Sequence, residues 1–153
     1  MRNNYRKLVW TVALISLAGC GSSAEVSQDQ LAEMAGGKLT EVVSVSGTVS
    51  VDGKPTAGIN LYLHDKSNKR LRQSRTDEKG KYCWSTHVLC DGLEPGKYKV
   101  TFRHIPVERD YDGNEAVDDL FKSRYSNARK SEYTLDVTAG APAAPVDYDL
   151  KSK

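Results

Sequence analysis

The chain has 153 residues, which is long enough for one ordinary domain and too short for a large multidomain enzyme. It carries 22 Lys and Arg against 20 Asp and Glu, but three of the basic residues, Arg2, Arg6 and Lys7, lie in the N-terminal segment that we predict is removed. The remainder then has 19 basic and 20 acidic side chains. This balance excludes an argument for nucleic-acid binding from overall charge.

Residues 1–19 predict a lipoprotein signal peptide. A basic start is followed by the uncharged, mostly apolar run 8–18, which is shorter than the ~20 residues of a transmembrane helix. The run ends in Leu17-Ala18-Gly19-Cys20, a sequence that resembles the lipobox cut by the lipoprotein signal peptidase. The resemblance implies cleavage after Gly19 and attachment of diacylglycerol, with palmitate-type acyl chains, at Cys20. An ordinary signal peptide followed by an incidental cysteine is the alternative.

The lipobox predicts an exported protein that is anchored to a bacterial membrane through its N-terminus. Gly21 follows the lipidated Cys20. In Gram-negative lipoproteins, an Asp at this position commonly retains the protein in the inner membrane. Its absence therefore favours the outer membrane over the inner membrane.

Residues 20–38 are predicted to form a flexible tether behind the lipid anchor, since small and polar residues follow Cys20. Ser27 and Gln30 have the spacing of a helix capping box, and Gly36-Gly37 would end such a helix. A two-turn helix is marginal in water by itself, so we expect a mostly disordered segment with this short helix as the alternative.

Residues 39–153 predict one all-β domain, because apolar and polar residues alternate in short runs separated by turn sequences. About seven strands without a long helical period indicate a β-sandwich. In this alternation Asn60 and Thr101 belong to the outward-facing set. The residues of opposite parity that we expect in the core are Val49, Leu61, Leu63, Trp84, Val100, Phe102, Leu135 and Tyr148.

Four segments with turn motifs follow one another in a characteristic order: 45–49 (VSGTV), 52–55 (DGKP), 76–82 (TDEKGKY) and 93–100 (LEPGKYKV). Together they resemble the carboxypeptidase regulatory-like domain family. The resemblance implies a non-catalytic, transthyretin-like Greek-key sandwich. More of the chain, including 122–127 (KSRYSN) and 146–150 (VDYDL), resembles small bacterial lipoproteins built from this single domain. No zinc-peptidase motif accompanies it.

Cys83 and Cys90 are the two thiols that remain once Cys20 is lipidated. In an oxidising compartment such a pair suggests a disulfide. Strand alternation places Cys83 opposite Tyr82 and Trp84, so the bridge would tie the following loop across the outside of the strand. Two free thiols, a redox pair and half of a metal site are the alternatives, but six intervening residues exceed the tight spacing of redox and zinc motifs.

Two charged segments have more than one interpretation. Residues 110–119 gather carboxylates of the kind that calcium requires, but Gly113 is misplaced for an EF-hand, and an acidic solvated loop is favoured. A basic cluster after Leu63 favours a solvated strand edge that discourages aggregation, with contact to anionic lipid head groups or envelope polysaccharide as the alternative. This basic cluster comprises Lys66, Lys69, Arg70, Arg72 and Arg75.

No sequence pattern pairs His64, His87 or His104 with a nucleophile, so we expect ordinary histidines, no enzyme activity, no cofactor and no metal. The function that we expect is a structural or interaction module for an envelope protein or polysaccharide. The alternative is a glycan-binding module. It would require exposed rings to form a stacking platform, and the candidates are Tyr62, Tyr111 and Tyr125.

Overall fold

The computed structural model describes residues 27–34, 36–37, 39–105, 119–141 and 144–153. The first element is the helix α1 (Gln28–Met34), which is the alternative that we gave to a mostly disordered tether, and it begins with the capping box. The Ser27 hydroxyl accepts a hydrogen bond from the Gln30 N–H at 3.2 Å, and the Gln30 side chain accepts one from the Ser27 N–H at 3.1 Å. Within the described residues, no helix has both the length and the apolar character needed to cross a membrane.

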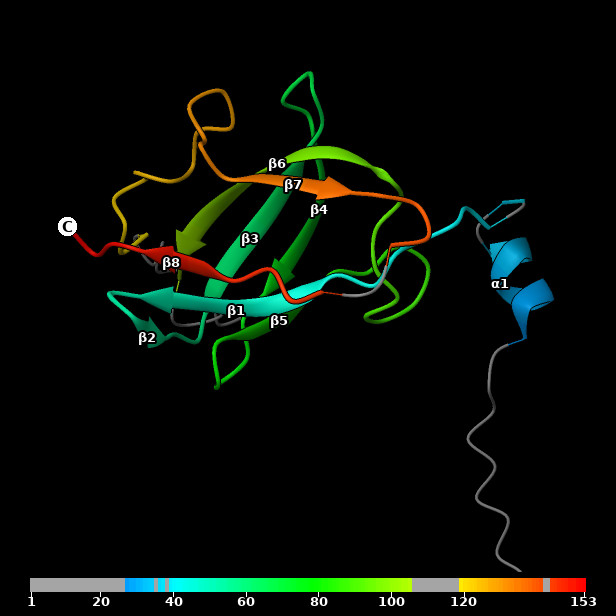
Figure 1. The fold of residues 1–153 in the computed structure, drawn as a ribbon, viewed down its shortest axis with the longest axis horizontal. Coiled ribbons are helices and arrows are strands. Elements are labelled where there is room, and N and C mark those ends of the chain that lie inside the picture. The colour runs from blue at the N-terminus through cyan, green and yellow to red at the C-terminus, as the bar shows by residue number, and fades with distance from the viewer. Residues whose placement is uncertain (1–26, 35, 38, 106–118, 142–143) are drawn as a thin grey trace, which may run out of the picture.

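The remaining elements are strands, and they form two β-sheets that lie one against the other as two layers (Figure 1). The first sheet contains β1 (Ser46–Val51), β2 (Lys54–Pro55) and β5 (Lys81–Cys83) in the order β2-β1-β5, and β8 (Tyr148–Leu150) pairs with β1 in parallel. The second sheet is antiparallel in the order β4-β3-β6-β7. Its strands are β3 (Ile59–His64), β4 (Arg70–Arg75), β6 (Gly96–His104) and β7 (Thr134–Val137).

This arrangement confirms the all-β prediction and the two layers of a β-sandwich. The described residues contain eight strands where we expected about seven, and the additional one is β2, which occupies two residues of the predicted turn. Asp52 and Gly53 form the two-residue loop between β1 and β2, with φ of 50° and 78°. Positive φ at both central positions matches the twist of a tight hairpin, and Asp followed by Gly tolerates it.

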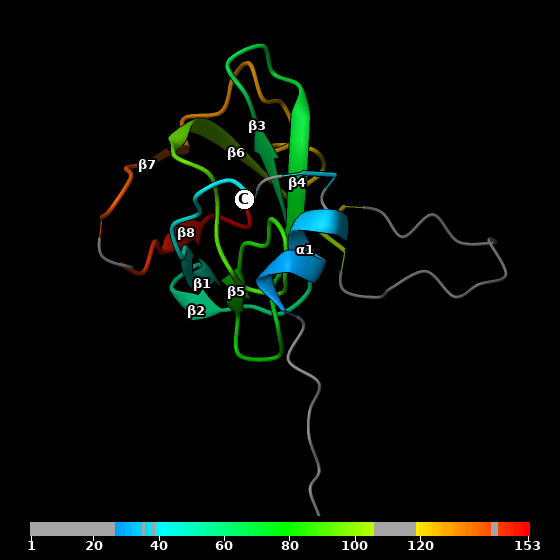
Figure 2. The same ribbon diagram turned by 90° about the vertical axis from the view of Figure 1, so that its right-hand side faces the viewer.

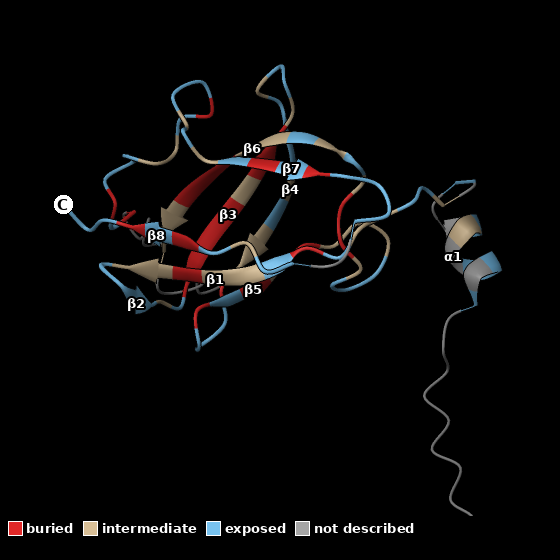
Figure 3. Ribbon diagram, in the orientation of Figure 1, coloured by how far each residue is buried: buried red, intermediate tan, exposed pale blue. Residues whose placement is uncertain are grey.

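The core lies between the two sheets, and all eight residues predicted for it are buried, with at most 7% of their surface exposed. Figure 3 shows the buried stretches on the facing strands β1 and β3. Phe102 is the centre of an aromatic cluster, because its ring meets those of Tyr133 and Tyr148 edge to face at 5.1 and 5.0 Å between centroids. Such edge contacts contribute beyond the burial of apolar area alone.

The outer face of the second sheet departs from the simple alternation. Asn60, His64 and Thr101 belong to the outward-facing set, but only 7%, 9% and 1% of their surfaces are exposed. The predicted outward orientation of Asn60 and Thr101 is therefore correct, but it does not expose them to water. Arg75 donates to the Asn60 side chain at 3.4 Å, and the side chains of His64 and Thr101 lie 2.9 Å from each other. The segment 119–133 pairs with the edge of β6 beyond β7, where its Tyr125 and Tyr133 carbonyls accept N–H groups of β6 residues.

Candidate functional site

The outer face of the second sheet carries a polar depression with a volume of about 360 Å³. Strands β3, β4 and β6 supply five of its lining residues, and the segment 119–133 supplies two serines at the rim. We call it the outer-face depression. Its lining residues are Tyr62, His64, Arg70, Thr101, Arg103, Ser123 and Ser126.

The floor of the outer-face depression is a buried hydrogen-bonded pair. The His64 Nε2 atom lies 2.9 Å from the Thr101 hydroxyl, and its Nδ1 atom lies 3.3 Å from the Asn68 carbonyl oxygen. A carbonyl oxygen only accepts, so Nδ1 donates to it, and in the neutral imidazole Nε2 then accepts from the Thr101 hydroxyl. Both polar groups of the floor are therefore satisfied, and the imidazole has one fixed orientation.

Two guanidinium groups form the walls. The Arg70 guanidinium lies over the Tyr62 ring at 4.9 Å from its centroid, in a cation–π contact that restrains the charge at the opening. The Arg103 side chain is 43% exposed, and its Nε atom lies 3.8 Å from an oxygen of Asp119. That Nε is buried and has no hydrogen-bond partner among the described residues.

Asp119 stabilises the segment that carries Ser123 and Ser126 at the rim. Its side chain is only 3% exposed, and its carboxylate accepts N–H groups of His104, Phe121 and Ser123 at 2.8, 3.1 and 3.1 Å. The interpretation of 110–119 as a solvated acidic loop is therefore wrong at Asp119, because a carboxylate that caps several backbone donors is stable when buried. Residues 110–118, and with them most of the candidate calcium ligands, lie outside the described residues.

The outer face around the depression is cationic. Strand alternation and register place the side chains of Arg70, Arg75, Lys97, Lys99 and Arg103 on this face. Asp136 is the one carboxylate among the outward strand positions of the described sheet, and it pairs with Lys97 at 3.0 Å. Figure 2 views the molecule with β4, the edge strand of this sheet, towards the reader. A face with this excess of positive charge attracts anions at short range.

The structure agrees with part of the sequence interpretation of the basic cluster as a solvated strand edge. β4 is indeed an edge strand, and Lys66 and Lys69 are exposed in the loop before it. Arg75, in contrast, donates hydrogen bonds to the Asn60 side chain at 3.4 Å and the Ile105 carbonyl at 2.9 Å. The cluster is therefore divided between solvated charge, structural hydrogen bonds and the wall of the depression.

Cys83 and Cys90 form the predicted disulfide, with their Cα atoms 5.2 Å apart, within the usual range for a bridge. Tyr82 and Trp84 are buried on the opposite side of the chain from Cys83, as the alternation predicts. The bridge therefore closes the loop on the outside of the sandwich.

Asp91 stabilises the loop that the disulfide closes. Its carboxylate accepts the backbone N–H groups of Thr86, His87 and Val88 at 2.6, 2.8 and 3.2 Å. Burial raises the pKa of Asp91, but the three donors and His87 outweigh it, so this pKa lies below its usual value. The loop therefore holds one conformation and projects Leu89, which is 86% exposed.

The histidines do not form a catalytic arrangement in the described residues. His87 Nε2 lies 3.1 Å from the Thr40 hydroxyl, but that hydroxyl donates to Glu94 at 2.8 Å. A catalytic chain requires the histidine between the carboxylate and the hydroxyl, and here the hydroxyl is in the middle. His104 packs on Phe121 with ring centroids 5.5 Å apart, and burial lowers its pKa.

The two candidate aromatic residues that the structure describes, Tyr62 and Tyr125, do not form an open platform. Tyr62 is half-buried beneath Arg70. Tyr125 packs against Phe121 at 5.1 Å between centroids, next to the core. Tyr111 lies outside the described residues. Among the residues that the structure describes, this arrangement favours an interaction module over glycan stacking.

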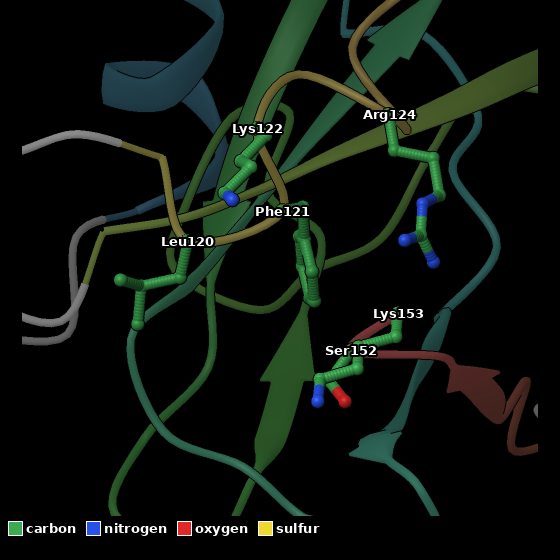
Figure 4. Close-up of a pocket in the computed structure, with 6 residues that line it drawn as sticks. All are labelled: Leu120, Phe121, Lys122, Arg124, Ser152 and Lys153. Carbon is green, nitrogen blue, oxygen red and sulfur yellow. The ribbon is translucent and has the colours of Figure 1, made fainter.

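A second depression lies between residues 120–124 and the end of the chain (Figure 4). Figure 4 shows the Phe121 ring between Leu120 and Arg124, with Ser152 and Lys153 next to it. Arg124 donates to the Lys151 carbonyl at 3.1 Å. This depression lacks the buried polar floor that distinguishes the outer-face depression, so we take the latter as the candidate site.

No group of three or more His, Cys, Asp and Glu side chains within the described residues could hold a metal ion. The position of the predicted lipid attachment, Cys20, lies outside that part of the chain.

Comparison with protein-family models finds no match, and neither does comparison with curated proteins. Among solved structures, BcpA, the major pilin subunit of Bacillus cereus, is similar with a TM-score of 0.48 and 13% identity over 73% of this chain. A substituted variant of that subunit gives a TM-score of 0.42 and 15% identity over 74% of this chain. The chain spans 30% of the length of each pilin chain. Similarity of this degree assigns neither a family nor a function.

Proposed function

We propose that this protein is a non-catalytic, lipid-anchored module of a bacterial cell envelope that presents the cationic outer face of its second sheet to an anionic partner. The observation that carries the proposal is the excess of positive charge around a depression with a fixed, buried floor. The outward strand positions of this face carry five cationic side chains and one carboxylate. The signal-peptide pattern and Cys20 support a position at the membrane, preferably the outer membrane.

We also propose a specific type of β-sandwich for this domain. The ordered turn motifs support a carboxypeptidase regulatory-like domain with transthyretin-like Greek-key topology. Members of one fold have many functions, so the proposed function is based on the site and not on this resemblance.

An anionic partner is favoured over a neutral glycan. A neutral sugar would need an open aromatic face, and the Tyr62 ring is covered by Arg70. Anionic envelope polymers and lipid head groups instead match the charge of the face.

Co-sedimentation with isolated cell envelopes tests the proposed interaction. The chain with Cys20→Ala, which removes the lipid attachment, should bind envelopes at low salt and be released as salt screens the charges. Reversal of two outward charges, Lys97→Glu with Lys99→Glu, should weaken binding roughly tenfold or more, since each cation near an anionic surface contributes about 1 kcal/mol.

The matched control is Lys54→Glu with Lys81→Glu, which changes the net charge equally on exposed positions of the first sheet. It should bind almost as well as the chain with the two native lysines. Equal weakening by both pairs, or binding that does not depend on salt, would contradict the proposal.

A further inference from the structure

We infer that the outer-face depression is a binding site for a phosphate group carried by an envelope molecule. The inference rests on the proposed function and specifies its chemistry. Its lining combines two guanidinium groups with the Ser123 hydroxyl, since the Thr101 and Ser126 hydroxyls donate to His64 and to the Ser123 carbonyl. A phosphate has acceptor oxygens in several directions, whereas a carboxylate has two in one plane, so donors that surround a ligand suit phosphate better.

Arg70 is the first donor. Its guanidinium is restrained over the Tyr62 ring at 4.9 Å, and no acceptor among the described residues takes a hydrogen bond from it. A planar guanidinium that is positioned by an aromatic ring retains all five N–H groups for a ligand. Because Arg70 also covers the ring, the same contact disfavours a stacked sugar.

Arg103 is the second donor. Its Nε atom is buried without a hydrogen-bond partner among the described residues. The nearest carboxylate oxygen, of Asp119, is 3.8 Å away, and that carboxylate already accepts three backbone N–H groups. The buried Nε cannot itself reach a ligand, but the Arg103 side chain is 43% exposed and lines the depression, so its other N–H groups can donate to an anion there.

The rim is held in a strained conformation. Lys122 and Ser123 follow one another with φ of 49° and 62°, in the left-handed region that residues other than glycine rarely adopt. The buried Asp119 stabilises this conformation through the Ser123 N–H. Ser123 and Ser126 thereby line the depression opposite the sheet. Strain of this kind is retained where it positions groups for a ligand.

Titration with inorganic phosphate tests the inference on the full-length chain in neutral detergent micelles. Two-dimensional NMR at constant ionic strength should show saturable shifts of the Thr101, Ser123 and Ser126 amides. Arg70→Gln should weaken phosphate binding roughly tenfold, because a hydrogen-bonded charge pair is lost. Arg103→Lys keeps a charge beside Asp119 and should weaken it several-fold, since the forked donor is lost.

Arg72→Gln is the matched control. Arg72 is on the same strand but pairs with the core residue Leu63, so it faces away from the depression. Phosphate binding should be unchanged in this variant. Absence of saturable shifts in the unmodified chain, or equal weakening by Arg72→Gln and Arg70→Gln, would overturn the inference, as would acetate binding as tightly as phosphate.

Two further ligands identify the source of the phosphate. Glucose 6-phosphate represents a phosphorylated sugar, and phosphatidylglycerol vesicles represent a lipid head group. Binding of either one with the same dependence on Arg70 supports the site and identifies its ligand class. If phosphate does not bind while salt-dependent envelope binding persists, the phosphate site is wrong and the proposed function stands. If envelope binding fails while phosphate still binds, the proposed function is wrong and the phosphate site stands.

Discussion

At the scale of single residues, buried or half-buried carboxylates that accept backbone N–H groups organise the loops of this protein. Asp119 fixes the rim of the outer-face depression, and Asp91 fixes the disulfide-closed loop. The sequence alone does not predict the role of Asp119, because its donors include His104, which is fifteen positions away. An isolated Asp in a polar stretch looks like any solvated carboxylate until the fold brings its donors to it.

The depressed pKa of Asp91 predicts a specific pH dependence. Because the folded pKa of Asp91 lies below the usual value of an aspartate, the contribution of Asp91 to stability is present above that usual value and is lost as pH falls through the folded pKa. Asp91→Asn should therefore lower the melting temperature at pH 7, and the difference from the unmodified chain should narrow towards pH 2. Thermal unfolding across this range measures it. A difference that stays constant from pH 7 to pH 2 would show that the charge of Asp91 is not the cause.

At the scale of elements, the sequence predicts those features that are determined by residues close together in the chain. The capping box of α1, the Asp52-Gly53 hairpin and the parity of the core strands all depend on neighbouring residues. The buried position of Thr101 on the outward face does not, since its side chain is hydrogen-bonded to His64, 37 positions away in the sequence. The outer-face depression could not be predicted for the same reason, although the basic residues of β4 gave a partial signal.

The disulfide should stabilise the domain without a part in its interactions. Replacement of both Cys83 and Cys90 by Ser should cost about 2 to 3 kcal/mol in the chain-entropy model, because the closed loop is short. The melting temperature should then fall by roughly 10 °C, while phosphate binding and membrane attachment stay unchanged. Non-reducing peptide mapping should recover the two cysteines on linked peptides. Free alkylation of both thiols in the folded, unreduced protein would contradict this structural role.

At the scale of the whole molecule, we propose that a lipid anchor at Cys20 and the cationic outer face of the second sheet act together. Such an anchor would bring that face close to envelope surfaces, where short-range electrostatics act over about 8 Å at physiological salt. Weak contacts then suffice, since tethering raises the effective concentration of the face at the membrane. The central claim is therefore that the protein is held at the membrane by lipid on Cys20.

Fractionation of cells combined with mass spectrometry of the N-terminal peptide tests this claim most directly. The chain with its native Cys20 should appear in the membrane fraction, lack residues 1–19, and carry the mass of the attached lipid on its first residue. Cys20→Ala should move the protein to the soluble fraction, because a lipid anchor is what holds it. Unchanged fractionation of Cys20→Ala, together with an N-terminal peptide that carries no lipid mass, would contradict the account.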